Sequence, residues 1–228
     1  MEVSKRLQAI AEMVSTGGCV ADVGCDHAYT SIYMIEKKLA SRVIAMDVKT
    51  GPLERAKAHV REYHQQDVID VRLSDGLAAL SPGEVDTILI SGMGGALMAR
   101  LLSDYPNITQ SVKELVLQPQ SELPKFRQHI HKLGFYLDDE EMIVDEGKIY
   151  TIIRAKFGHE QTPYTNEEYL FGRILMRKKS PVWVKFMQVE TEKTRKLLDI
   201  LGQGNTIEQQ KRIMELRNYE KALKSGGC

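Results

Sequence analysis

Residues 20–35 read VADVGCDHAYTSIYMI, and this stretch decides which fold we expect. A short apolar run leads into a tight turn with one glycine, Gly24, and then into an amphipathic segment. Turns that bring a backbone close to a cofactor usually hold several glycines, because side chains would block the approach. Asp26 and His27 stand here instead of small residues, so the turn predicts a ligand site with polar chemistry of its own.

The composition is typical of a soluble globular protein. The chain has 228 residues, 43% hydrophobic and 27% charged, which allows one ordinary domain and a smaller appendage. No run approaches the roughly 20 apolar residues that cross a bilayer, and the amphipathic N-terminus predicts no secretory signal. Cys19, Cys25 and Cys228 form no CxxC pair, which favours a reducing cytoplasm. His129 and His131 lack ligand spacing, so we expect no metal.

The charge is unevenly distributed along the chain. Residues 1–159 hold 18 Lys and Arg against 22 Asp and Glu, whereas residues 160–228 hold 13 against 9. A basic appendage on an acidic body indicates a polyanionic partner. A solvated helical face explains the same charges, and charge alone favours this second interpretation.

The apolar pattern predicts strands that alternate with helices, an arrangement typical of a parallel sheet covered on both faces. The expected strands are residues 19–23, 42–47, 68–73, 85–91 and 114–118. The expected helices are residues 3–15, 29–39, 52–64, 94–104 and 121–133.

The alternation breaks after residue 133. Residues 134–144 and 148–157 are strand-like and joined by DEG, which predicts an antiparallel hairpin at the end of the sheet. Beyond residue 160 we expect helices at 165–179, 181–202 and 206–224, with a loop at GQGN. The last two helices are expected to form an antiparallel coiled-coil-like pair.

Acidic residues follow three successive predicted strands, where ligands bind in open α/β sheets. Asp47 ends the second strand and is placed to bind ribose hydroxyls. Asp75 follows the third and is placed to accept the exocyclic amine of an adenine, with Leu77 against the ring. Each acid alone is also explained by an ordinary strand-end turn. The GxGxxG pattern is absent, so a pyrophosphate-binding turn is poorly supported.

The series DVGCDHAY, AMDV, SDGL, SGMGG and LQPQ resembles the bacterial tRNA (adenine-22-N1)-methyltransferases. The resemblance covers nearly the whole chain, including YTNEEYLFGRILMRKKSPVWVKFMQVE in the C-terminal part. The chain departs from the broad methyltransferase pattern DxGxGxG at Asp26 and Ala28, and both departures match the narrower family. The resemblance implies a class I methyltransferase domain at residues 1–159, with a seven-stranded Rossmann-like sheet, and a helical coiled-coil-like tRNA-binding appendage at residues 160–228.

The resemblance also implies S-adenosylmethionine as methyl donor, S-adenosylhomocysteine as product and no metal. The expected cofactor-binding residues are Asp22, Gly24, Cys25, Asp26, His27, Asp47, Val48, Asp75, Gly76, Leu77, Gly92, Met93 and Gly94.

The implied reaction is attack by adenine N1 of tRNA on the methyl group, after the base has flipped into a pocket of the DHAY, GMGG and LQPQ loops. The expected catalytic residues are Asp26, Tyr29, Met93 and Gln118. Asp26 is placed to accept from adenine N6 or to hold the cofactor, and Tyr29 and Met93 to contact the base. Helix capping by Asp26, core packing of Tyr29 and turn bonds of Gln118 remain alternatives.

The expected partner is tRNA, with no membrane and no obligate protein partner, in the cytoplasm. The residues expected to bind RNA are Lys5, Arg6, His27, Gln120, Arg173, Arg177, Lys178, Lys179 and Lys185. Two other functions remain in view: a non-catalytic RNA-binding protein with this fold, and a nicotinamide-dependent oxidoreductase. The single glycine of the first turn and the terminal hairpin disfavour the oxidoreductase.

Overall fold

The computed structural model describes residues 3–202 and 206–227. The chain divides into two compact units, with the boundary between Thr162 and Pro163. We call these the sheet unit and the helical unit and describe each by itself. The domain boundary predicted between residues 159 and 160 lies a few residues before this division and stays a prediction.

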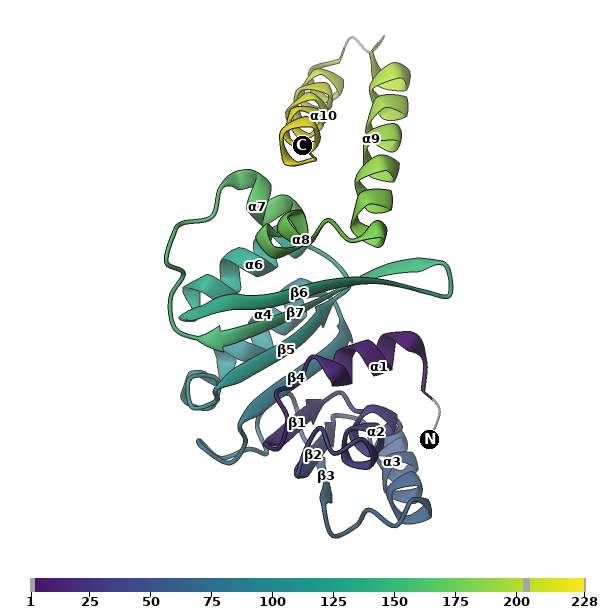
Figure 1. Cartoon of the computed structure of the whole chain (residues 1–228), viewed down its shortest axis with the longest axis vertical. Coiled ribbons are helices and arrows are strands. Elements are labelled where there is room, and N and C mark those ends of the chain that lie inside the picture. The colour runs from purple at the N-terminus through teal and green to yellow at the C-terminus, as the bar shows by residue number, and fades with distance from the viewer. Residues whose placement is uncertain (1–2, 203–205, 228) are drawn as a thin grey trace. The chain divides into compact units, whose positions relative to one another are not determined.

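The sheet unit is built on a seven-stranded sheet with strand order β3-β2-β1-β4-β5-β7-β6 (Figure 1). Strands β1 to β5 run parallel, and β7 lies antiparallel to both β5 and β6, so the predicted terminal hairpin is confirmed. The strands are β1 (Cys19–Val23), β2 (Arg42–Asp47), β3 (Ile69–Leu73), β4 (Thr87–Met93), β5 (Glu114–Pro119), β6 (Phe135–Asp145) and β7 (Lys148–Phe157).

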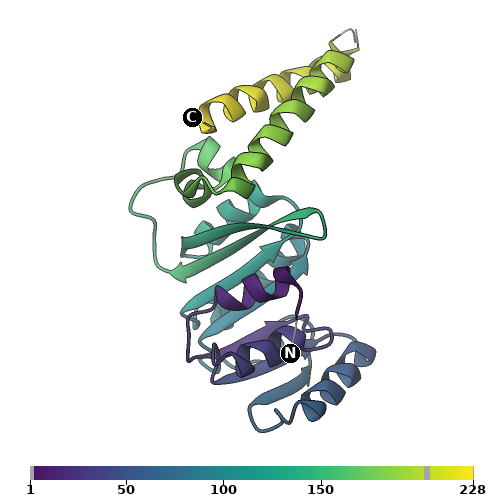
Figure 2. The ribbon, with the colours of Figure 1, turned by 45° about the vertical axis from the view of Figure 1, so that its right-hand side comes forward.

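Helices cover both faces of this sheet, as the alternating pattern predicts. One face carries α1 (Lys5–Glu12), α2 (Tyr29–Glu36) and α3 (Thr50–Glu62), and the other carries α4 (Gly95–Asp104) and α6 (Leu123–Lys132) (Figures 1 and 2). The short helix α5 (Pro106–Thr109) was not predicted, because four residues are too few to show helical periodicity.

Burial explains why the central strands read as continuous apolar runs. Every residue of β5 is buried, and Ile88, Leu89 and Ile90 of β4 are fully enclosed. A parallel strand covered on both faces has no solvent side, so it shows no alternation of apolar and polar residues. Strand β1 pairs with β2 on one side and β4 on the other, which makes the β1–β4 edge the topological switch point of the sheet.

The helical unit contains α7 (Asn166–Phe171), α8 (Arg173–Lys178), α9 (Pro181–Leu201) and α10 (Ile207–Gly226). Thr165 begins α7 with a capping box that pairs it with Glu168. The prediction of one continuous helix over 165–179 was wrong, because the segment forms two helices. Gly172 has φ of 83°, outside the helical region, and separates α7 from α8.

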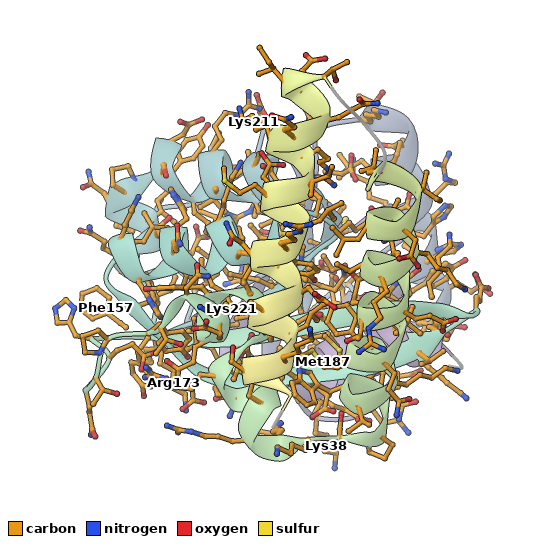
Figure 3. All side chains as sticks on the ribbon, turned by 90° about the horizontal axis from the view of Figure 1, so that it is seen from above. Lys38, Phe157, Arg173, Met187, Lys211 and Lys221 are labelled. Carbon is orange, nitrogen blue, oxygen red and sulfur yellow. The ribbon has the colours of Figure 1, made fainter. Side chains whose placement is uncertain are left out.

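Helices α9 and α10 pack along each other within the helical unit. Met187 of α9 is buried and lies between the two helices (Figure 3). Trp183 is also buried, and its indole N–H donates to the Phe171 carbonyl at 3.2 Å. Coiled-coil geometry for this pair stays a prediction, and the predicted GQGN loop lies, from residue 203 onward, outside the described residues.

Candidate functional site

The turn after β1 has an unusual backbone. Gly24, Asp26 and Ala28 all have positive φ, at 78°, 49° and 59°. A Cβ on Gly24 would stand 2.5 Å from the Met93 methyl carbon, so a side chain there would also displace Met93. The N–H groups of Gly24 and Cys25 donate to the Met46 carbonyl of β2, at 2.8 and 2.9 Å. The loop is therefore anchored to the neighbouring strand where it leaves β1.

A cavity of about 210 Å³ opens beside this turn, at the topological switch point. Its walls come from the β1 turn, from the end of β4 and from α1, so it joins segments far apart in the sequence. The lining residues are Arg6, Leu7, Asp22, Gly24, Cys25, Asp26, His27, Tyr29, Thr30, Ser91 and Gly92. Leu7, Thr30 and Ser91 were not predicted.

Asp22 is the buried acid of this cavity, with 3% of its surface exposed. Burial, reinforced by the charge of Asp47, raises the pKa of Asp22 to about 6, although the Ser31 hydroxyl donates to its carboxylate at 2.6 Å and opposes the rise. A bound cation beside this carboxylate is favoured, since it would replace the hydration that burial removes.

Cys25 also lines the cavity, but burial, together with the nearby carboxylates, raises the pKa of its thiol. The thiol therefore stays protonated at neutral pH, which excludes it as a thiolate nucleophile. Its place in the wall suits packing against a ligand.

Asp47, at the end of β2, lies next to the β1 turn. Its carboxylate accepts the N–H groups of Asp26, at 3.3 Å, and of Lys49, at 2.9 Å. Two carboxylate oxygens offer about four acceptor positions, so capacity remains for the hydroxyls of a ribose. Val48 follows with 59% of its surface exposed, which presents an apolar side chain beside these acceptors.

The turn after β3 carries Asp75, the acid predicted to follow the third strand. Asp75 is exposed, and its carbonyl accepts the Tyr105 hydroxyl at 3.2 Å. Gly76 has φ of 59°, and a Cβ there would approach Leu101 to 2.7 Å. Leu77 is fully buried, so we no longer assign it the predicted contact with an adenine ring. The exposed Leu73, which was not predicted, is the register partner of Asp47 and suits that contact better.

Gln118 of β5 bonds two residues of the cavity lining, Arg6 and Gly92. It is fully buried, and its Oε1 accepts the Gly92 N–H at 3.2 Å and the Arg6 Nη1 at 3.3 Å. The Arg6 guanidinium also lies 5.5 Å from the centre of the Tyr150 ring. Among the described residues, the direct contacts of this guanidinium are thus a neutral amide and an aromatic ring, and the carboxylates of Asp22 and Asp26 line the same cavity.

Several predicted residues flank the cavity without lining it. Met93 and Gly94 are partly exposed, and Gln120 is exposed, with its N–H donating to the Met93 carbonyl at 2.9 Å. His27, by contrast, lines the cavity with a partly buried ring. Its Nε2 lies 3.5 Å from Asp26 Oδ1, and its Nδ1 is buried with no hydrogen-bond partner among the described residues.

The predicted RNA-binding residues differ in exposure. Arg173 is 6% exposed, and its guanidinium bonds Glu168 and the Pro163 carbonyl and stacks 3.8 Å from the Tyr164 ring centre. Its charge is neutralised inside the helical unit, so it is not presented to a phosphate, and we withdraw that assignment. Arg6 is partly buried at the cavity, and the other predicted cations, Lys5, Arg177, Lys178, Lys179 and Lys185, are exposed.

Comparison with known proteins agrees with this strand-end site. A family model described as a methyltransferase domain matches residues 3–153. The curated tRNA (adenine(22)-N(1))-methyltransferase of Bacillus subtilis is 33% identical over 98% of this chain and 96% of its own length. The chain belongs to the tRNA (adenine(22)-N1)-methyltransferase family. The family resemblance drawn from the DHAY and GMGG loops is therefore confirmed.

Solved structures of the family share the fold over the full chain. The crystal structure of the B. subtilis m1A22 tRNA methyltransferase TrmK has a TM-score of 0.90 and 31% identity, covering 100% of this chain and 99% of that one. The Streptococcus pneumoniae protein Sp1610 in complex with S-adenosyl-L-methionine has a TM-score of 0.88 and 32% identity, with full coverage of both chains. The predicted class I methyltransferase fold is confirmed.

The donor set of the site suits a zwitterionic nucleoside. The cavity holds a carboxylate in Asp22 and a guanidinium in Arg6, and acceptors for hydroxyls lie next to it in Asp47. Within residues 3–202 and 206–227, no group of His, Cys, Asp and Glu side chains is arranged to hold a metal. In the same ranges, no helix is long and apolar enough to span a membrane.

Proposed function

We propose that this protein transfers a methyl group from S-adenosylmethionine to N1 of an adenine in tRNA, at position 22. The observation that carries the proposal is the cavity at the switch point, where Gly24, Asp22 and Arg6 meet beside Asp47. Family membership supports the reaction, since the curated B. subtilis relative is named for it. A tRNA substrate also agrees with the cytoplasmic location that the sequence predicts.

The proposed cofactor contacts follow the chemistry of the ligand. When bound, S-adenosylmethionine supplies a methyl group on a cationic sulfur, which makes that carbon electrophilic. Asp22 would hold the ammonium of its amino acid part and Arg6 the carboxylate, so Arg6 moves from the predicted RNA contacts to the cofactor. Asp47 would bind the ribose hydroxyls, and Val48, Leu73 and Asp75 the adenine.

At the reacting end, we assign Asp26 to the target base. The Asp26 side chain is 69% exposed at the cavity, so its carboxylate can accept a hydrogen bond from adenine N6. Methylation at N1 makes the base cationic until a proton leaves N6, and a carboxylate there stabilises the charge and accepts the proton. Tyr29, 39% exposed, and Met93 offer faces for the flipped base.

Gln118 receives a positioning role in place of the predicted contact with the base. Its Oε1 already accepts from Gly92 and Arg6, and the side chain is fully buried. It would therefore fix the Gly92 backbone and the Arg6 guanidinium without touching the substrate.

Exposed cations of both units would bind the tRNA backbone. We propose Lys5 in the sheet unit and Arg177, Lys178, Lys179 and Lys185 in the helical unit as phosphate contacts. Gln120 and His27 remain proposed contacts near the target nucleotide.

Mass mapping of nucleosides in unmodified tRNA tests the function. Incubation with S-adenosylmethionine should produce 1-methyladenosine at position 22, and a matched tRNA with guanine at that position should stay unmodified. Binding of tRNA without methylation would instead favour the non-catalytic RNA-binding protein. Binding of nicotinamide dinucleotides in place of S-adenosylhomocysteine would favour the oxidoreductase.

A further inference from the structure

The backbone of the DHAY loop is held in a costly conformation. Asp26 and Ala28 occupy the left-handed region although neither is glycine, at φ of 49° and 59°. Such residues persist only where the surrounding contacts determine the conformation. Strand β2 supplies these contacts for the first half of the loop, through the Met46 carbonyl and the Asp47 carboxylate.

The second half of the loop is held from α3. His59 Nδ1 lies 3.0 Å from the His27 carbonyl oxygen. A carbonyl only accepts hydrogen bonds, so Nδ1 must carry the proton and donate. The His59 ring also stacks on Tyr29, with 4.8 Å between ring centres and 22° between planes, and lies 5.6 Å from the His27 ring. His59 therefore contacts the residues that flank the left-handed Ala28.

We propose that His59 is a positioning residue for methyl transfer. This inference rests on the proposed function, because it assigns His59 the task of holding Asp26 and Tyr29 where the target base needs them. The donated hydrogen bond fixes the His27 carbonyl, which in turn fixes the peptide that joins His27 to Ala28. His59 itself does not line the cavity, so in this arrangement it would touch neither substrate nor cofactor.

The proposed effect is on alignment and leaves cofactor binding intact. Gly24 and Asp47 are anchored through β2, independently of His59. Loss of the His59 donor would let the His27–Ala28 peptide leave its place, so Tyr29 would move away from the base and Asp26, still held through its N–H by Asp47, would be less firmly oriented. A misplacement of about 1 Å lowers rate constants by as much as about 100-fold, so a measurable fall is expected.

Three substitutions separate the two contacts of His59. His59→Asn keeps an N–H donor near the Nδ1 position and removes the ring, His59→Phe keeps a ring and removes the donor, and His59→Ala removes both. Arg55→Ala, an exposed position on the same helix, is the matched control. The measurements are single-turnover methylation at saturating cofactor and tRNA, hydrogen exchange of the peptide 20–33, affinity for S-adenosylhomocysteine and Tm.

We expect His59→Ala and His59→Phe to lower the single-turnover rate constant by about tenfold and to speed exchange in the loop by a similar factor. His59→Asn should stay within about threefold of the unsubstituted protein in both measurements, because it retains the donor. Affinity for S-adenosylhomocysteine should change by less than about twofold in all variants.

Two results would overturn the inference. The first is unchanged loop exchange in His59→Ala. The second is failure of His59→Asn to restore rate and exchange, with affinity and Tm falling in parallel, which would make His59 a residue of general stability. If the unsubstituted protein transfers no methyl group, the proposed function fails, and loop exchange still decides whether His59 holds the loop.

Discussion

The strand-end cavity of the sheet unit and the basic end of α8 in the helical unit use charge in opposite ways. In the cavity, Asp22 is 3% exposed and its carboxylate is fixed by Ser31. At the end of α8, Arg177 and Lys179 are exposed to solvent. Buried charges interact strongly and at short range, whereas exposed ones are weakened by water and salt. Substitutions in the cavity should therefore give large effects on one ligand, and those on α8 small, salt-dependent ones.

Two arginines sharpen this comparison. Arg173 is enclosed in the helical unit, where the Glu168 carboxylate neutralises it. Arg6 reaches the cavity, where its guanidinium contacts the neutral Gln118 amide and the Tyr150 ring. Arg6 is partly exposed and lines the cavity, so its guanidinium is better placed for an external anion than that of the enclosed Arg173.

The largest expected effect is on turnover, at Asp26. Asp26→Asn removes the proposed proton acceptor but keeps a similar shape, so the single-turnover rate constant should fall by about 100-fold. Affinity for tRNA should change by less than about threefold, since a single exposed charge contributes little to binding. Asp67→Asn, at an exposed acid outside the cavity, is the control. A near-normal rate in Asp26→Asn would exclude Asp26 as a required base.

The next effect is on cofactor affinity, at Asp47. Asp47→Ala removes the proposed ribose acceptor and should weaken S-adenosylhomocysteine binding by about 10- to 100-fold, the size of one or two charge-assisted hydrogen bonds. The substitution also leaves the Asp26 and Lys49 N–H groups without their acceptor. Asp47→Asn keeps one acceptor oxygen, so its affinity in a calorimetric titration should lie between those of the unsubstituted protein and Asp47→Ala. Unchanged affinity in both variants would remove the ribose role.

The sequence predicts the sheet well because its signals are local. Strand-length apolar runs and the short DEG turn specify β1 to β7 without reference to distant residues. The break between α7 and α8 was missed because both segments have helical periodicity, and only the positive φ of Gly172 separates them. The short α5 escaped for the opposite reason, since it has no room for a period.

The site is only partly legible in the sequence, because its walls come from distant segments. Gly24 follows β1 and Asp47 ends β2, so both could be predicted from their place in the chain, whereas Asp22, inside β1, came from the family resemblance. The burial of Gln118 and Arg173 depends on tertiary packing, so both seemed available for ligands. His59 lies inside an ordinary helix with no motif around it, and its contact with the DHAY loop is visible only in three dimensions.

Substitution of Asp22 should raise the stability of the ligand-free protein and lower its affinity for the cofactor. Its pKa of about 6 in the folded protein exceeds the usual 3.8, so between pH 4 and 6 the folded state binds more protons than the unfolded state. The free energy of unfolding therefore falls as pH rises through this window, by about 1–3 kcal/mol in total from this group. Asp22→Asn should remove that fall and stabilise the ligand-free protein at pH 7.5 by a similar amount.

The same Asp22→Asn substitution should weaken S-adenosylhomocysteine binding by about tenfold, because the partner of the ammonium loses its charge. Urea denaturation across pH 4 to 8, together with calorimetric titration, measures both effects. Asp67→Asn, at an exposed acid, should change neither by much. Lower stability and unchanged affinity in Asp22→Asn would remove Asp22 from the proposed cofactor contacts.

The smallest effect is expected at the end of α8. Replacing Arg177, Lys178 and Lys179 with glutamine should weaken tRNA binding by about three- to tenfold at moderate salt, as exposed ion pairs are each weak. The magnitude of the slope of log affinity against log salt should fall by about 2 to 3, because the loss of three phosphate contacts means that binding releases fewer counterions. Lys211, Arg212 and Arg217 on α10 give a control with the same change in charge; Lys211 is labelled in Figure 3.

If both triple variants lower the slope equally, net charge governs binding and the α8 cluster has no special role. If neither does, these cations form a solvated helix end, and the helical unit engages tRNA through other groups.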